Sequence, residues 1–119
     1  MFDPKDLYTF SDKILGFYYS EEAARRSVVS RSYYAVFLIL REKLRVSHPS
    51  EVHDDPTDHA NIVHALRRRG YSYEAQKCFD LKDERHTADY KLQIPCTEGK
   101  ANEVLLDAKE LDNFAIKVL

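Results

Sequence analysis

The sequence predicts an all-α protein, folded as an antiparallel up-and-down bundle of about five helices in one domain spanning residues 1–119. Apolar residues recur at three- and four-residue steps along most of the chain, which is the spacing of one helix face. Only three glycines and four prolines interrupt these runs. No segment shows the sustained apolar–polar alternation of a half-buried strand. The chain is therefore expected to bury a single helical core.

The first helix is predicted to begin at Asp3 and Pro4, because an acidic N-cap followed by proline at the first helical position is a common helix start. Ser20 then has the features of the N-cap of a second helix, with acidic residues directly after it where the helix dipole favours them. The apolar stripe of the first helix is expected to be Leu7, Phe10, Ile14 and either Phe17 or Tyr18.

The second helix is predicted to be long, because no glycine or proline interrupts the chain from Ser20 to His48. Its apolar residues spread over two neighbouring stripes, so its middle is expected to be covered on two sides. These stripes are Ala24, Val28, Ala35 and Leu38, and Tyr33, Phe37, Leu40 and Leu44. Arg31 lies in this apolar part. Either its side chain extends to the bundle edge, or it pairs with an acid of another helix, for which Asp89 is the candidate.

The second half of the chain is predicted to form three more helices. Residues 47–58 hold two prolines and no apolar periodicity, so they are expected to form a loop. Thr57 or Asp58 is expected to cap a third helix that ends before Gly70 as the C′ residue. A fourth helix starts at Ser72, and a break over 91–100 precedes the last helix. The apolar residues expected on these last two helices are Ala75, Cys78, Phe79, Leu81 and Ala88, and Val104, Leu105, Ala108, Leu111, Ala115 and Val118.

Composition excludes several classes of protein. A net charge of −2 gives no global field that would attract nucleic acid, so any anion site must be a local cluster. Two cysteines are too few for a disulfide framework and favour a reducing, cytoplasmic setting. No apolar run approaches the roughly 20 residues of a membrane span, and the N-terminal residues do not resemble a signal peptide. No histidine pair has metal-binding helical spacing, so no metal and no cofactor are expected.

The segment LKDERHTADY, residues 81–90, concentrates side chains that carry chemistry. On a helix Arg85 and Asp89 share a face, and His86 and Tyr90 form the adjacent row. Arginine binds phosphate through its planar fork, and histidine exchanges protons near neutral pH. The segment is therefore either a solvated helix end or a site that handles phosphate.

Two segments resemble the HEPN superfamily. SRSYYAVF, residues 30–37, is similar to the family's second-helix signature, and RHTADY, residues 85–90, is similar to a later Arg-x-x-Ala-Asp-Tyr element of one branch. The resemblance implies a small α-helical bundle that dimerises. Many members are metal-independent ribonucleases, often encoded beside a minimal nucleotidyltransferase as toxin and antitoxin. Others act as binding or interaction modules.

The resemblance assigns candidate catalytic roles to Arg85, His86 and Tyr90. Arg85 matches the motif arginine and His86 the polar residue that follows it. Where the family has its motif histidine, this chain has Tyr90, Lys91 and Leu92. A tyrosine with a pKa near 10 is a poorer base at neutral pH than a histidine. Whether the protein is an enzyme therefore stays open.

The sequence thus predicts a homodimeric nucleotide- or RNA-binding component of a toxin–antitoxin or defence system, acting with a nucleotidyltransferase partner. Arg31, Tyr34 and Asp89 are the expected ligand-binding residues. One alternative is an active metal-independent endoribonuclease. The other is a non-enzymatic interaction module, in which Arg31, Tyr34, Asp89 and Tyr90 form a buried network between the second and fourth helices.

Overall fold

The computed structural model describes residues 2–119, and this part of the chain contains five α-helices, one short 3-10 turn and no strand. The all-α prediction is confirmed. The elements are α1 (Asp6–Tyr18), α2 (Glu22–Ser47), the 3-10 turn η1 (Pro49–Glu51), α3 (Asp58–Arg68), α4 (Ser72–Tyr90) and α5 (Glu98–Val118).

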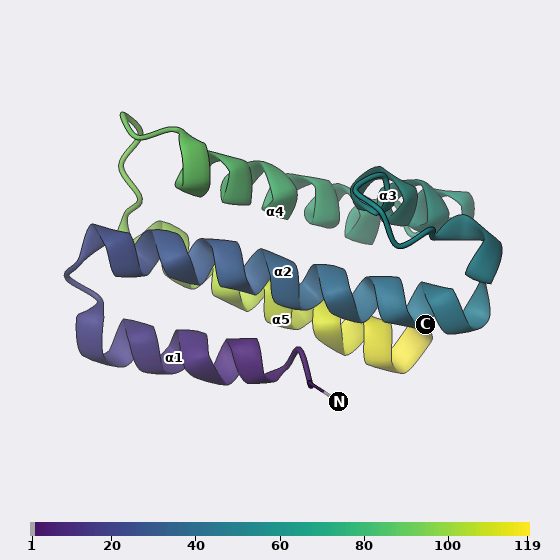
Figure 1. Cartoon of the computed structure of the whole chain (residues 1–119), viewed down its shortest axis with the longest axis horizontal. Helices are drawn as coiled ribbons and strands as arrows, with labels where there is room; N and C mark the ends of the chain where they lie inside the picture. The colour runs from purple at the N-terminus through teal and green to yellow at the C-terminus, as the bar shows by residue number, and fades with distance from the viewer. Residues whose placement is uncertain (1) are drawn as a thin grey trace.

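Four long helices lie lengthwise and alternate in direction along the chain, as an up-and-down bundle requires (Figure 1). The long helix α2 is the hub, since it packs against α1, α4 and α5. The short helix α3 sits at the end where α2 terminates and packs mainly on α4. The resulting bundle measures 42 × 29 × 24 Å.

The core is built around α2, and one of its two predicted stripes is fully confirmed. The buried residues of that stripe are Tyr33, Phe37, Leu40 and Leu44. The other stripe is buried at Val28 and Ala35, but Leu38 is only half-buried, and Tyr34 beside it is 36% exposed. One face of α2 therefore remains open. On α4 the prediction for Phe79 is wrong, since that side chain points outward and is 47% exposed.

The turn between α3 and α4 follows the sequence prediction closely. Gly70 has φ of 83°, the left-handed conformation that glycine adopts without a Cβ penalty. The Tyr71 N–H donates to the Leu66 carbonyl and the Gly70 N–H to the Arg67 carbonyl, both at 3.0 Å. These are the two bonds of a Schellman motif, so the last carbonyls of α3 are satisfied.

The predicted N-caps of the first two helices are displaced. The Asp3 carboxylate accepts from the Lys5 N–H at 3.0 Å, and α1 begins only at Asp6. Asp3 therefore stabilises the turn that leads into α1. Ser20 lies outside α2, whose N-cap is Glu21 in extended conformation.

The N-cap of α3 is Thr57, one of the two predicted residues, although its side chain makes no capping hydrogen bond. Asp58 is the first residue of the helix and binds the preceding loop. Its carboxylate is completely buried and accepts from the N–H groups of His53 and Asp54, both at 2.8 Å. These bonds hold the pKa of Asp58 below its usual value although burial opposes this. The loop between α2 and α3 is thereby fixed against the first turn of α3.

Arg26 of α2 ties together the end of α4 and the connection that follows it. Its Nη1 donates to the Ala88 carbonyl at 2.8 Å, and its Nη2 donates to the Ile94 carbonyl at 2.6 Å. Glu22, one turn earlier, pairs with the guanidinium at 3.0 Å and also accepts from the Cys96 N–H. Because the last carbonyls of a helix lack partners inside the helix, Arg26 completes the C-terminal turn of α4.

Both ends of the described chain lie beside the second half of α2 (Figure 1). Phe2, Pro4 and Leu119 line one apolar pocket of about 570 Å³ together with Val46. The pocket joins the start of α1 to the end of α5.

No helix within residues 2–119 combines the length and the apolar composition that a membrane span requires.

Replacing Arg26→Ala is expected to lower the free energy of unfolding by about 2 to 3 kcal/mol, because charge-assisted bonds to the Ala88 and Ile94 carbonyls are lost. Urea denaturation measures this change. Arg67, which is exposed in the last turn of α3, provides the control, and Arg67→Ala is expected to change stability by less than about 0.5 kcal/mol. Equal effects of the two substitutions would refute the role assigned to Arg26.

Candidate functional site

Arg85 occupies an aromatic shell on the inner side of α4. Its side chain is 12% exposed, and its guanidinium carbon lies 5.9 Å, 5.5 Å and 6.0 Å from the ring centres of Tyr33, Tyr34 and Tyr90. Nη1 donates to Asp89 at 3.4 Å, whereas the buried Nε has no partner among the described residues. Because a guanidinium has five N–H donors, Arg85 retains unused capacity for an anion.

The other candidate residues of α4 gather around Arg85. The ring centres of His86 and Tyr90 are 5.0 Å apart, and both side chains are exposed. Asp89 also accepts from the Ser30 hydroxyl at 3.3 Å, which links α4 to α2. We call the group formed by Ser30, Tyr34, Arg85, His86, Asp89 and Tyr90 the Arg85 site.

Arg31 is the expected site residue that the structure places elsewhere. Its Nε donates to Ser27 at 2.9 Å, and its guanidinium lies 5.0 Å from the ring centre of Phe10 on α1. The ion pair expected with Asp89 does not form, because successive residues point about 100° apart on a helix. Ser30 faces α4, and Arg31 faces α1.

The buried network expected between α2 and α4 is also wrong. Tyr34 is 36% exposed and Tyr90 is 65% exposed, and Arg31 makes no ion pair within residues 2–119. The two resembling segments do meet, but through the single Ser30–Asp89 hydrogen bond and the packing of Arg85 on the tyrosine rings.

His59 of α3 is a member of the same aromatic shell that the sequence did not indicate as functional. Its ring stacks on Phe37 with centres 4.2 Å apart and an interplanar angle of 11°. Its Nδ1 contacts the Tyr33 hydroxyl. The available signal was spacing, since His59 precedes Ile62 and Val63 at the three- and four-residue steps of an apolar face.

Burial is the first cause that lowers the pKa of His59, and the nearby cations Lys82, Arg85 and Arg41 lower it further. Both effects disfavour the charged imidazolium. Burial also raises the pKa of Tyr33, so its hydroxyl stays protonated. The result is a neutral imidazole at neutral pH in a partly buried, cation-rich surrounding.

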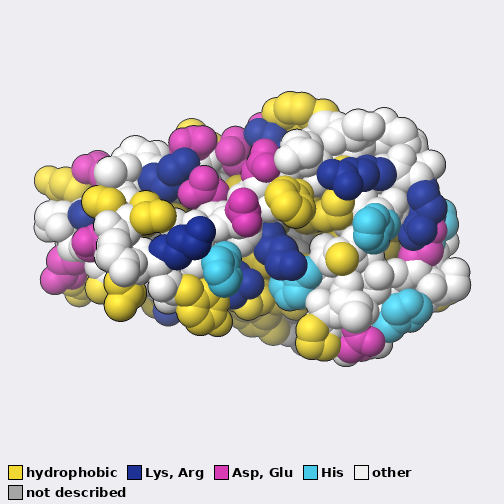
Figure 2. Space-filling model, turned by 90° about the horizontal axis from the view of Figure 1, so that it is seen from above, with side chains coloured by type: hydrophobic (Ala, Val, Ile, Leu, Met, Phe, Trp, Pro, Cys, Tyr) yellow, Lys and Arg dark blue, Asp and Glu magenta, His cyan; other side chains and the backbone are white. Residues whose placement is uncertain are grey.

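The surface that carries these residues has charges of both signs. Figure 2 shows Lys, Arg and His side chains across the middle of the face over α3 and α4, with acidic side chains among them and at the edges. The cations that act on His59, namely Lys82, Arg85 and Arg41, form a local positive group although the net charge of the chain is −2. A local cluster of this kind is what anion binding requires in an acidic protein.

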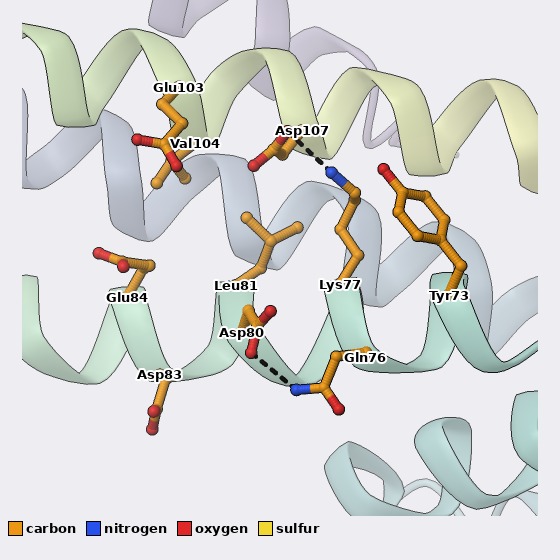
Figure 3. Close-up of a pocket in the computed structure, with 10 residues that line it drawn as sticks. All are labelled: Tyr73, Gln76, Lys77, Asp80, Leu81, Asp83, Glu84, Glu103, Val104 and Asp107. Atoms are coloured by element: carbon orange, nitrogen blue, oxygen red, sulfur yellow. Dashed lines mark hydrogen bonds and ion pairs between the residues drawn. The ribbon is translucent and has the colours of Figure 1, made fainter.

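A concave region between α4 and α5 is acidic (Figure 3). This groove of about 320 Å³ contains one cation, Lys77, which pairs with Asp107 at 3.0 Å and with Glu110 at 3.5 Å. Its acidic lining residues are Asp80, Asp83, Glu84, Glu103 and Asp107. Such a lining repels anions, so a phosphate ligand is not expected there.

Two further observations bear on the site. The described part of the chain contains no group of three or more His, Cys, Asp and Glu side chains placed to hold a metal ion. In comparisons with known proteins, no family model, no curated protein and no solved structure matches the chain. The functional assignment therefore depends on the side chains of the Arg85 site.

His59 is expected to make the fold sensitive to acid. Because the pKa of this base is lower in the folded state than in the unfolded chain, its contribution is complete above about pH 6.5 and is lost as the pH falls below that value. His59→Gln is therefore expected to lose less stability than the wild type between pH 7 and pH 5. His64→Gln, on the exposed side of the same helix, should retain the wild-type pH dependence. Thermal denaturation across this range tests both, and identical profiles for all three proteins would contradict the assignment.

Proposed function

We propose that the chain is a HEPN-like helical module that binds the phosphate of a nucleotide or of RNA at the Arg85 site. The observation that carries this proposal is the guanidinium of Arg85, which is 12% exposed and has a buried Nε without a partner in residues 2–119. Leaving a buried donor unsatisfied costs free energy. Nη1 makes only a long hydrogen bond of 3.4 Å to Asp89, so a phosphate oxygen can accept from the terminal nitrogens and form the charge-assisted bond that arginine makes well.

Exposed rings beside Arg85 favour a nucleotide over a simple anion. Tyr34 and Tyr90 each lie within about 6 Å of the guanidinium and present part of their surface to solvent. His86 adds a third ring next to Tyr90. Aromatic side chains next to a cation are the combination on which bases of single-stranded nucleic acid stack.

The family resemblance supports the same site. The segments SRSYYAVF and RHTADY meet on α2 and α4, where Asp89 accepts from Ser30 and Arg85 packs on Tyr33 and Tyr34. A shared site needs such proximity. The finer expectations drawn from the resemblance, namely a nucleotidyltransferase partner and a role in a toxin–antitoxin or defence system in the cytoplasm, belong to this proposal.

RNA cleavage is the second candidate function, and the position of His86 favours it. The exposed imidazole lies 5.0 Å from the Tyr90 ring, whose centre is 6.0 Å from the Arg85 guanidinium carbon. A base that takes the 2′-hydroxyl proton and a cation that stabilises the phosphorane are the parts needed for cleavage without a metal. The interaction-module alternative loses its expected support, because the buried network between Arg31 and Asp89 is not formed.

A homodimer is part of the proposal, and the open face of α2 supports it. Leu38 is incompletely covered there. Phe10 of α1, 48% exposed, packs on Arg31 at the edge of the same face. A second copy placed on this face would cover exposed apolar surface and bring two Arg85 sites near one another.

Arg85→Ala is expected to weaken binding of a short unstructured RNA at least about tenfold, since a charge-assisted contact in a partly buried site is lost. Isothermal titration calorimetry measures the affinity. Arg85→Lys should keep part of it, because the charge remains and the fork is lost. Arg67→Ala, at the exposed end of α3, should bind like the wild type.

Unchanged affinity in a folded Arg85→Ala protein would reject the binding proposal. The same RNA, incubated in a chelator and analysed for fragments, distinguishes the second candidate. Cleavage that disappears in both Arg85→Ala and His86→Ala would identify an endoribonuclease. Intact RNA in every sample, with binding that still requires Arg85, leaves a binding module.

The dimer is tested by sedimentation equilibrium at micromolar concentration. The wild type is expected to sediment as a dimer, and Phe10→Ser, which removes apolar surface at the α2 face, is expected to shift it toward monomer. Leu106→Ser is the matched control, since Leu106 is 65% exposed on α5. A monomeric wild type, or equal effects of both substitutions, would argue against this interface.

A further inference from the structure

The positive surface continues past Arg85 toward α3. Lys82 lies one helical turn before Arg85 on α4, at a spacing that brings side chains together. Its ammonium makes no ion pair with any other described residue. Arg41 of α2 places its guanidinium 5.1 Å from the centre of the Phe37 ring. Its contact with Asp54 is long, at 3.7 Å, and its side chain is 24% exposed.

Ring contacts place Arg41 and Arg85 around one aromatic cluster. Arg41 lies 5.1 Å from the Phe37 ring, which stacks on His59 at 4.2 Å. Arg85 lies 5.5 Å from the Tyr34 ring, which is 6.4 Å from His59. The imidazole is acted on by Arg41 from α2 and by Lys82 and Arg85 from α4. Asp58 of α3 is the acid that opposes them. Its carboxylate is occupied by two backbone N–H groups at 2.8 Å and by the side chain of Asn61 at 3.1 Å. Positive charge therefore exceeds negative charge around this ring.

We propose that Lys82 and Arg41 form a second anion position beside Arg85, so that the site takes a ligand with two neighbouring phosphoryl groups. This inference rests on the proposed binding of a first phosphate at Arg85. The Tyr34 ring lies between the two positions, 5.5 Å from the Arg85 guanidinium carbon and 6.4 Å from the ring centres of Phe37 and His59. A bound diphosphate or a strand of two phosphodiesters would pass along this ring.

His59 reports on the second position. An anion between Lys82 and Arg41 reduces the positive field at the imidazole, so its pKa rises when the ligand binds. Linkage then requires the converse effect, in which protonation of His59 strengthens binding by the same factor. The stacking of His59 on Phe37 holds the ring in place for this response.

Calorimetry with inorganic phosphate and inorganic pyrophosphate tests the number of positions. The wild type is expected to bind pyrophosphate more tightly than phosphate. Lys82→Ala is expected to weaken pyrophosphate binding roughly three- to tenfold, the effect of one nearby charge, and to leave phosphate binding within about twofold. Lys82→Gln should behave in the same way. Lys117→Ala removes an exposed lysine of α5 and should alter neither affinity.

Nuclear magnetic resonance of the histidine rings supplies an independent readout. The pKa of His59 is expected to rise with saturating pyrophosphate, whereas the ring signals of the exposed His64 should not respond to the ligand. The RNA trinucleotide UpUpU, with two phosphodiesters and no terminal phosphate, distinguishes the two sources of paired phosphoryl groups. A His59 response to UpUpU indicates a nucleic-acid strand, and a response to pyrophosphate alone indicates a diphosphate.

The two proposals fail in different ways. Equal loss of phosphate and pyrophosphate binding in Lys82→Ala, or a His59 pKa that pyrophosphate does not change, would overturn the second position while Arg85-dependent phosphate binding persists. Phosphate binding that is unaffected by Arg85→Ala would overturn the first position. In that case the proposal of two neighbouring positions, which rests on the first, would fall with it.

Discussion

The placement of the candidate site depends on the hydrogen bonds that Arg26 donates to carbonyls at the end of α4. These carbonyls have no partner inside the helix, and Arg26 reaches them from α2 at 2.8 Å while its other nitrogen fixes the following connection at 2.6 Å. These bonds fix the axial position of the last turn of α4 relative to α2. Arg85 lies within one turn of Ala88, so its position opposite the tyrosines of α2 follows from the same contact.

The aromatic shell gives the site its chemical character. The faces of tyrosine rings attract a guanidinium through their quadrupole and exclude water from it, but they accept few hydrogen bonds. Arg85 is accordingly held without being saturated, since its closest carboxylate oxygen lies at 3.4 Å. Arg69 is different, because it is paired with Glu51 at 2.7 Å and also donates to the Ala65 carbonyl. Whether an arginine has a binding or a structural role therefore depends on how many of its donors are already paired.

The helices and the main buried stripe were accessible from sequence, because periodicity and the Gly70 signal are local properties of the chain. Which side of α2 faces α4 was not, since the choice between Ser30 and Arg31 depends on the rotation of α2 about its axis. The role of His59 could not be predicted for the same reason, because its neighbours come from α2 and α4. Residue type alone did not identify the helix caps. Ser20 lies outside α2, and the Asp58 carboxylate accepts hydrogen bonds from the preceding loop.

The shared pocket of Phe2, Pro4 and Leu119 places the two ends of the described chain side by side, away from the connection fixed by Arg26. A short covalent linker between them would close the polypeptide into a ring at small entropic cost, because loop closure depends only weakly on a few added residues. The order of the helices in the sequence could then change without changing how the helices pack. The bundle is, in topology, a candidate for circular permutation with α5 leading into α1.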